Sequence, residues 1–483
     1  MFYLYLILLP VLSGCVSFLR LNKNLRAFIA SLICMMFFLL VDFLFKNHLL
    51  QFTTSPVKIR AFLEISFLLD NWSLSFLRLL SFLWPLCNIY CIYYTEDLKI
   101  NQTFSKEGFY AFYQFSIAAC VGGILAGDLL TMFLFYEVLS LVTIPLININ
   151  HSKEGAAALK YYIFHLVGCS AFFIFSALVV CLVDGGSLSF TESNNLSSAS
   201  SLKTTIVMLG FVFGSAKFAI FPLHSWLPRA MVAPVPVSAL LHAVAVVKLG
   251  AFFVFRALHD VIGFANIKLS SVSSLLGGWW FVYLACFSAI YGSFLALRQK
   301  ELKKMLAYST ISQLSYIAIA IAMFSDQSAK IVFTQIAAHA LSKITLFFCC
   351  GIILMHNKAI TVQKIHGLAK MLPITCFCFC IAAFAMIGLP LTSGYIVKQQ
   401  MLEASFGAGG GIFVQFCLLL STILTAMYFL PIIYRMFFAN SAKAISVKSF
   451  FKLQECNTML LLVIIVFSVL NFLFFKNLLI TIL

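Results

Sequence analysis

Five ionisable side chains of this sequence lie deep inside long apolar segments. They are Glu137, Lys217, Lys248, Lys343 and Lys398. Each charge at the centre of a bilayer costs at least about 2.5–3.5 kcal/mol, so a set of five is hard to assign to folding alone. A lysine removed from water loses and regains a proton more readily, and a carboxylate nearby restores its charge. This row of groups suits proton transfer, with Glu137 near Lys217 acting as a switch of proton affinity.

For any single residue of this row the alternative is structural. A long side chain can reach the membrane surface, or it can form a buried ion pair. This alternative applies most to Lys398, which lies nearest to a helix end. It explains the whole row much less well than it explains one member.

Four histidines are candidate proton relays between chains of water. They are His165, His224, His242 and His339. An imidazole gains and loses its proton near physiological pH. His339 stands four residues before Lys343, so the two share one face of a helix. The alternative for each histidine is a packed or hydrogen-bonded residue of the core.

Prolines interrupt two of the apolar segments that carry lysines. "AIFPLHSWLP" contains Pro222 and Pro228, and "MIGLPLTSGY" contains Pro390. Lys217 precedes the first interruption and Lys398 follows the second. An interrupted membrane helix frees backbone groups and leaves room for water, although membrane helices also tolerate proline without such a role.

The composition requires that membrane-spanning helices position these residues. The chain is 62% hydrophobic and 10% charged, whereas soluble domains are about 25% charged. Apolar runs of about 18 residues predict an all-α integral membrane protein with about 14 transmembrane helices. The first run lacks the basic start of a signal peptide, so we interpret it as a retained helix. The predicted segments are 2–19, 27–45, 73–94, 108–125, 126–148, 157–183, 202–222, 234–256, 274–297, 305–325, 331–355, 371–395, 410–435 and 458–480.

The formal charge of +16 comes mostly from short loops between the apolar segments. Basic residues such as Arg229, Lys303 and Lys304 gather in the loops after odd-numbered segments. By the positive-inside rule those loops face the cytoplasm or matrix, and both termini lie on the outer side. This distribution favours topology signals over the binding of a nucleic acid.

Two groups of five segments have a related order. The fourth to eighth segments form one group and the ninth to thirteenth the other, and the fourth member of each is broken by proline. Because five is odd, the two groups insert with opposite orientation, and matching broken helices in inverted halves are typical of transport sites. The predicted parts are residues 1–107 (helices 1–3), 108–256 (first repeat), 274–435 (second repeat) and 436–483 (loop and last helix).

The cysteines of the sequence predict packing rather than metal binding. Cys376, Cys378 and Cys380 lie in one apolar helix. At about 100° per residue, Cys378 points away from the other two, so the three cannot converge on one ion. The sequence also has no dinucleotide fingerprint or nucleophile pair. We therefore predict neither a metal nor a cofactor.

Five stretches of the sequence have a characteristic order. "FGSAKFAIFPLHSWLPRAMVAPVPVSALLHAVAVVKLGAFFVFR" contains the first interruption with its two lysines, and "YEVLSLVTIPLI", "AAALKYYIFHLVG", "LRQKELKKMLAYSTISQLSYI" and "HALSKITLFFCCG" surround it. Together they resemble the antiporter-like membrane subunits. That family joins the Mrp-type multisubunit sodium/proton antiporters, the proton-pumping subunits of respiratory complex I and membrane-bound hydrogenases. The resemblance spans roughly residues 60 to 440.

The resemblance implies fourteen helices, two inverted five-helix halves and a polar axis along the middle of the membrane. The broken seventh and twelfth helices are predicted by the prolines themselves. Four residues are similar to the family's charged positions on helices five, seven, eight and eleven: Glu137, Lys217, Lys248 and Lys343, in that order. Lys398 is similar to the lysine that ends the axis in some members of the family. His339 lies beside the eleventh-helix lysine. Some members of the family have a glutamate at the last position.

Within the family, the sequence favours an Mrp-type D-like subunit. Its length is near that of such subunits, and "HAVAVVKLG" keeps a lysine that the largest complex I subunit usually lacks. No long lateral helix is predicted after the last segment. However, "PLHSWLPRAMVAPVPVSALLHA" is closer to the large-subunit and hydrogenase pattern, so subunits of complex I or a hydrogenase remain alternatives.

The leading hypothesis is therefore a proton-translocating membrane subunit of a multisubunit monovalent cation/proton antiporter, with sodium as the expected cation. In one alternative the same row of residues translocates protons, but redox reactions in other subunits of NADH:quinone oxidoreductase or a hydrogenase supply the energy. An alternative of another class is a membrane scaffold that conducts nothing. On the leading hypothesis the chain is a transporter subunit and not itself an enzyme.

The same hypothesis predicts partners and location. The expected partners are other membrane subunits, lipid, protons and a monovalent cation, without nucleic acid. The expected location is the bacterial inner (plasma) membrane, with the mitochondrial inner membrane as the alternative.

Overall fold

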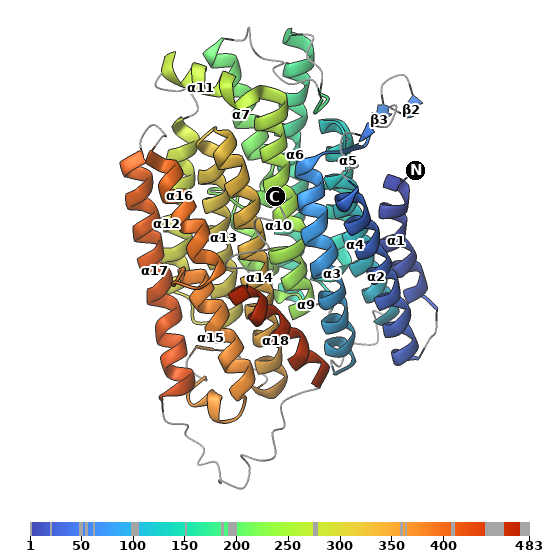
Figure 1. Cartoon of the computed structure of the whole chain (residues 1–483), viewed down its shortest axis with the longest axis vertical. Helices are drawn as coiled ribbons and strands as arrows, with labels where there is room; N and C mark the ends of the chain where they lie inside the picture. Colours follow the sequence, from blue (N-terminus) through green and yellow to red (C-terminus); the bar gives the residue numbers. More distant parts are fainter. Residues whose placement is uncertain are drawn as a thin grey trace.

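Helices make up nearly all of the computed structural model of the chain. Most of them stand side by side along one direction (Figure 1). This confirms the predicted all-α class. The structure describes residues 2–19, 22–47, 52–53, 57–60, 63–97, 106–149, 152–184, 188–191, 200–273, 279–357, 361–362, 365–406, 411–439 and 458–473.

Six long helices form the N-terminal part of the bundle. They are α1 (Phe2–Ser17), α2 (Lys23–Lys46), α3 (Asn71–Asp97), α4 (Lys106–Ile124), α5 (Leu129–Ile147) and α6 (Lys153–Asp184). Asp128 fixes the start of α5, because its carboxylate accepts a hydrogen bond from the backbone nitrogen of Thr131 at 2.7 Å. An aspartate at this position satisfies one of the free N–H groups of a helix N-terminus.

Four short strands lie between α2 and α3, where the sequence analysis predicted no strand. They are β1 (Phe52–Thr53), β2 (Val57–Arg60), β3 (Leu63–Ile65) and β4 (Leu68–Leu69). β1 pairs with β4 and β2 pairs with β3, both antiparallel. Figure 1 shows β2 and β3 at the upper right of the bundle, and β3 contacts α5.

The chain then passes through a series of short helical pieces. They are α7 (Ser201–Gly214), the 3-10 turn η1 (Ala216–Phe218), α8 (Trp226–Arg229), the 3-10 turn η2 (Ala230–Val232), α9 (Val235–Ala239), the π-helical turn η3 (Leu240–Val244), α10 (Val246–Arg256), the π-helical segment η4 (Ala257–Gly263) and α11 (Phe264–Ser273). The non-helical backbone from Ala219 to Ser225 is the first predicted break. Pro222 lies exposed within it, and Pro228 lies buried in α8.

The C-terminal part repeats the pattern of long helices with one break. Its elements are α12 (Trp279–Leu297), α13 (Leu302–Ala322), α14 (Asp326–Asn357), the 3-10 turn η5 (Leu368–Lys370), α15 (Pro373–Ile387), α16 (Ser393–Phe406), α17 (Gly411–Phe437) and α18 (Thr458–Leu473). The second break separates α15 from α16 and contains the exposed Pro390. Gly388 ends α15 with φ 85°, the left-handed conformation that glycine adopts at helix C-termini.

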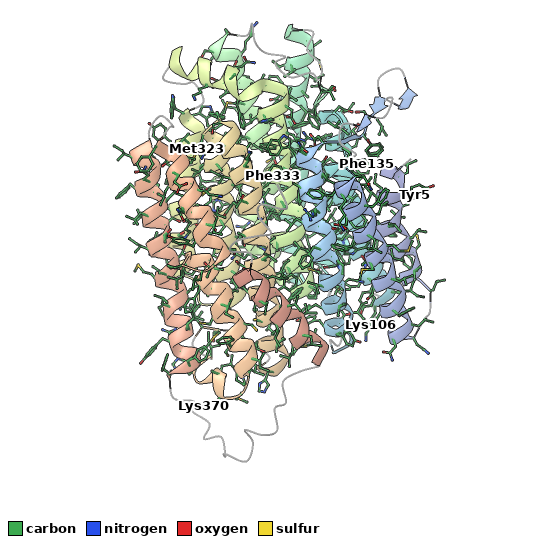
Figure 2. The ribbon with its side chains drawn as sticks, viewed as in Figure 1. Tyr5, Lys106, Phe135, Met323, Phe333 and Lys370 are labelled. Atoms are coloured by element: carbon green, nitrogen blue, oxygen red, sulfur yellow. The ribbon has the colours of Figure 1, made fainter. Side chains whose placement is uncertain are left out.

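Two central helical regions are enclosed by the others. The most apolar 18-residue stretches within residues 235–268 and 327–356 are fully buried, whereas only 28% of the corresponding stretch of α2 is buried. Figure 1 accordingly shows α10 and α14 between an N-terminal group that includes α1–α4 and a C-terminal group that includes α12 and α15–α17. Side chains fill the space between the helices (Figure 2). The ring of Phe333, for example, stacks on that of Trp72 with centroids 5.1 Å apart.

Nine helices of the described chain are long and apolar enough to cross a membrane, and four shorter apolar helices accompany them. Each of the 14 segments that the sequence analysis predicted contains a helix. The number of crossings remains a prediction, because several segments are short. The multi-pass membrane character of the chain follows from these lengths and hydropathies.

Some predicted boundaries differ from the structure. The segment predicted to end at residue 256 continues as helix to Ser273, because π-helical backbone extends α10 into α11. Residues 274–278, 440–457 and 474–483 lie outside the described residues, so the predicted start of the ninth segment and most of the predicted last part fall there. The division into four parts remains a prediction.

Candidate functional site

Lys217 lies at the first break and is fully buried. It belongs to η1, and Ala219 follows with a left-handed φ of 51°. Its Nζ donates to the backbone oxygen of Tyr136 at 2.6 Å and to Ser140 Oγ at 2.6 Å. The ammonium also lies 3.1 Å from the centroid of the Tyr136 ring. A carbonyl, a hydroxyl and an aromatic face, all uncharged, therefore hold this lysine.

Glu137 follows Tyr136 on α5, yet its carboxylate does not contact Lys217. Among the described residues no ion pair joins the two side chains, and the buried Oε1 of Glu137 has no hydrogen-bond partner. The carboxylate still lies close enough for its charge to act on Lys217. A buried acceptor without a partner costs about 1–3 kcal/mol. The arrangement keeps Glu137 near the lysine without binding it.

A glycine brings the first break against α10. A Cβ atom at Gly250 would lie 2.6 Å from the backbone nitrogen of Phe218 in η1. Ser215 Oγ also donates to the backbone oxygen of Gly250 at 3.0 Å. The close approach fixes Lys217 relative to the helix that carries Lys248.

Lys248 contacts His339 across the two central helices. Its Nζ lies 2.5 Å from Nδ1 of His339, and both side chains are buried. When the ammonium donates, Nδ1 must accept through its lone pair, so the ring is neutral and carries its proton on Nε2. Nε2 is buried without a partner. One short hydrogen bond therefore connects two groups that can each hold a proton.

Lys343 stands one turn beyond His339 on α14 and turns toward α13. Its Nζ donates to the backbone oxygen of Leu306 at 2.8 Å and to the hydroxyl of Ser309. The charge of Lys248 acts on Lys343, and the charge of Lys343 acts on His339. Lys248, His339 and Lys343 thus form one cluster at the centre of the molecule.

Lys398 lies at the second break, half-buried between α15, α16 and α17. Its Nζ donates to the backbone oxygen of Ile387 at 2.6 Å and to Thr422 Oγ1 at 3.0 Å. Ile387 is the last residue of α15, and carbonyls at a helix C-terminus have no partner within the helix. A cavity of about 250 Å³, lined also by Tyr395 and Leu418, opens beside the ammonium.

The remaining histidines occupy two places. His242, in η3, is fully buried, lacks partners on both ring nitrogens and lies within reach of the charge of Lys343. His224 packs its ring 5.4 Å from Tyr291. His165 donates to or accepts from Ser225 Oγ at 3.2 Å. His165 and His224 therefore lie at the first break, away from the central cluster.

The structure thus divides the predicted residues into separate groups. Glu137 lies with Lys217, and Lys398 stands apart from both lysines of the central cluster. Sequence reasoning missed Tyr136, Ser140 and Ser309, which bind the lysines, because hydroxyls are common in apolar helices and give no signal on their own. It also placed Lys303 among loop residues, whereas its Nζ donates to the backbone oxygens of Met231 and Ala233 at 2.6 Å each.

The enclosed lysines, the two broken helices and the long apolar spans define a multi-pass membrane protein of transporter type. Residues 126–425 match the family model described as NADH:quinone oxidoreductase/Mrp antiporter, transmembrane region. The chain belongs to this family, which confirms the resemblance drawn from the sequence.

Individual relatives come from both branches of the family. The chain is 33% identical over 344 residues to NADH-quinone oxidoreductase subunit N of Desulforudis audaxviator, covering 69% of this chain and 66% of that protein. It is 27% identical over 399 residues to antiporter subunit mnhA2 of Staphylococcus epidermidis, covering 77% and 48%. The chain therefore spans about half to two thirds of the length of these curated relatives.

A solved structure shares the fold. A chain in the structure of the Mrp complex from Dietzia sp. DQ12-45-1b superposes with a TM-score of 0.83 at 19% identity, covering 100% of this chain and 95% of that one. At this identity the likeness concerns the fold.

Proposed function

We propose that this chain is a proton-translocating membrane subunit in which Glu137 and the four lysines hold and pass protons. One observation carries the proposal: Lys217, Lys248, Lys343 and Lys398 are each held by uncharged acceptors, and none is ion-paired among the described residues. A lysine that is bound by carbonyls, hydroxyls or a neutral imidazole can lose its proton without leaving an uncompensated carboxylate behind. A lysine in a buried ion pair cannot, because loss of its proton would leave the partner carboxylate buried with an uncompensated charge.

The same row favours protons over a metal cation as the species that it binds. Alkali and alkaline-earth cations are bound by oxygen ligands, with carboxylates prominent among them. The row offers one carboxylate, Glu137, and four ammonium groups that repel cations. Exchange of a cation would therefore need a site elsewhere in the assembly.

The leading form of the proposal is exchange of protons for sodium or another monovalent cation, as a D-like subunit of an Mrp-type antiporter. The similarity to an antiporter subunit of Staphylococcus epidermidis supports it. The second candidate is a redox-driven proton-pumping subunit, which the 33% identity to a NADH-quinone oxidoreductase subunit supports. In either form other membrane subunits are the partners, and the bacterial inner membrane, with both termini outside, is the proposed location.

The test measures proton movement in everted membrane vesicles from cells that express the whole gene cluster, with native Lys217 or with Lys217→Ala. Dye dequenching on addition of sodium, lost in the variant, would support cation/proton exchange through this row. Proton pumping that needs NADH or another reductant, with no response to sodium, would support the redox-driven form. Full activity of the assembled variant would refute the proposal and leave a membrane scaffold.

A further inference from the structure

The last two lysines of the row bind different helices. Lys343 binds the N-terminal half of α13, whereas Lys398 binds the end of α15 and Thr422 of α17. Neither a hydrogen bond nor electrostatic coupling joins the two lysines in the part of the chain that the structure describes. A proton that passes between them therefore needs intermediate groups.

Hydroxyl groups line the facing sides of α13 and α17 between these lysines. Ser309, Ser312 and Tyr316 are spaced by three and four residues on α13, and Ser421 and Thr425 are spaced by four on α17. Residues at such spacings share one face of a helix. All five side chains are fully buried. We call these residues, together with Thr422 and Tyr428 of α17, the hydroxyl stripe.

Lys343 is connected to one end of the hydroxyl stripe. It donates to the hydroxyl of Ser309, and the hydroxyl of Tyr428 lies beside Ser309. Tyr428 in turn donates to Thr425 Oγ1 at 3.4 Å. The first lysine is thus followed by three hydroxyls that lead from α13 onto α17.

At the middle of the stripe two of its serines form a triangle with Ser293, a serine outside it. Ser312 Oγ lies 3.1 Å from Ser421 Oγ, and Ser293 of α12 lies 2.8 and 2.9 Å from these two. The hydroxyl of Tyr316 is buried, has no hydrogen-bond partner and lies beside Ser421. A buried hydroxyl without a partner costs about 1–3 kcal/mol, which packing alone does not explain.

The other end of the stripe reaches Lys398. Thr422 Oγ1 accepts a hydrogen bond from Lys398 Nζ at 3.0 Å, and it also lies beside the unpartnered hydroxyl of Tyr316. Lys398 Nζ stands 5.6 Å from the centroid of the Tyr316 ring. Tyr316 therefore adjoins both the serine triangle and the group that contacts the last lysine.

We propose that the hydroxyl stripe carries protons between Lys343 and Lys398. This inference rests on the proposed function. In one passage the Lys343 ammonium gives a proton to Ser309 Oγ, and each hydroxyl then passes its own proton to the next oxygen. Because Thr425 donates to the backbone oxygen of Ser421, a water carries the proton from Thr425 to the serine hydroxyls. Thr422 delivers a proton to the Lys398 amine. Every O–H bond that breaks is replaced by a new one, so the net change is one proton moved. The hydroxyl of Tyr316 adjoins both Ser421 and Thr422, so rotation of its O–H bond suffices to face one or the other.

The test removes hydroxyls without removing side chains. Tyr316→Phe and Tyr428→Phe, alone and together, are compared with native protein in vesicles that contain the assembled complex. General acid–base groups contribute about 100-fold or more, so the double variant is expected to translocate protons at least about tenfold more slowly. Tyr90→Phe is the matched control, because that buried hydroxyl donates to the backbone oxygen of Phe348 outside the stripe.

A second pair of variants addresses the contact with Lys398. Thr422→Val keeps the shape of the side chain but removes the hydroxyl, and Thr422→Ser keeps the hydroxyl. We expect the valine variant to be slow and the serine variant to stay near the native rate. This pair decides the question if the phenylalanine variants fail to assemble, as measured by copurification of the partner subunits.

The outcomes separate the relay from the proposed function. If Lys343→Ala stops translocation while Thr422→Val and the assembled double phenylalanine variant keep rates within about twofold of native, the relay is wrong and the proposed function stands. If an assembled Lys343→Ala complex translocates at the native rate, the proposed function itself fails.

Discussion

The hydroxyl of Ser140 provides one of two hydrogen bonds that hold the Lys217 ammonium, so Ser140→Ala changes the proton affinity of that lysine alone. The variant removes the acceptor at 2.6 Å and leaves the backbone oxygen of Tyr136 and its ring in place. Alanine is the best helix former, so the substitution does not weaken α5 by itself.

The size of the effect follows from the charge on the donor. A hydrogen bond to a charged group contributes about 1.5–3 kcal/mol. Since 1.36 kcal/mol is a factor of ten in protonation, the charged state of Lys217 loses about 10- to 150-fold against the neutral state. Water that enters the break at η1 replaces part of the lost contact, so we expect the low end, about tenfold.

The assay is the pH profile of proton translocation in vesicles that contain the assembled complex. If a protonated Lys217 takes part in the limiting step, the alkaline limb of the profile moves about one unit toward lower pH. Thr143→Ala is the control, because the Thr143 hydroxyl lies on the same helix but contacts the hydroxyl of Tyr162 and the backbone oxygens of Leu139 and Ser140 instead of the lysine. Identical profiles for native protein and Ser140→Ala would refute the reasoning.

Two further predictions concern how the site is held together. Gly250→Ala places a methyl group 2.6 Å from the backbone nitrogen of Phe218 and should lower the stability of the fold by about 1–3 kcal/mol. Gly168→Ala is the control, because a Cβ there has no atom within 4 Å, so the melting temperature of the solubilised complex should stay unchanged or rise slightly. Equal losses of melting temperature in the two variants would contradict this prediction. Burial alone would raise the pKa of Asp70, but Arg256 at 2.6 Å and Ser73 hold it below its usual value. Such a carboxylate stabilises the fold above its unfolded pKa of about 3.9 and loses that contribution as pH falls through the folded value. Asp70→Asn should therefore lower the melting temperature at pH 7 and flatten its fall below about pH 4, and an unchanged pH dependence of melting would oppose that assignment.

The charged residues and the breaks could be found in the sequence because each is rare in its surroundings. A lysine such as Lys248 in the middle of an apolar run has a cost that composition alone reveals. The prolines near residues 222 and 390 mark the interruptions because proline removes a backbone donor from a helix. Both signals are local, so no knowledge of the packing was required.

The partners of those residues depend on how helices rotate against each other, which local patterns do not encode. Ser140 and Ser309 resemble other hydroxyl residues of apolar helices, such as Thr310, whose hydroxyl bonds only its own helix. The contact of Lys248 with His339 joins residues 91 positions apart. It depends on the π-helical turn η3 just before α10, because one extra residue in a turn changes which face of the following helix points inward.

The separation of Glu137 from Lys217 has an energetic meaning for the proposed mechanism. Opposite charges 4 Å apart attract by about 4 kcal/mol at the effective dielectric of a protein near its surface, which is close to a factor of a thousand in proton affinity. Uncharged groups bind Lys217, and the Glu137 carboxylate lies nearby. A small movement of α5 relative to η1 that brings the carboxylate closer would favour protonation of the lysine, and the reverse movement would favour release of the proton. Lys248 and Lys343 have no such carboxylate among the described residues, but the charge of Lys248 acts on Lys343. In the proposed mechanism the neutral acceptors therefore leave the proton affinity of Lys217 to be set by the charge of Glu137, and that of Lys343 by the charge of Lys248.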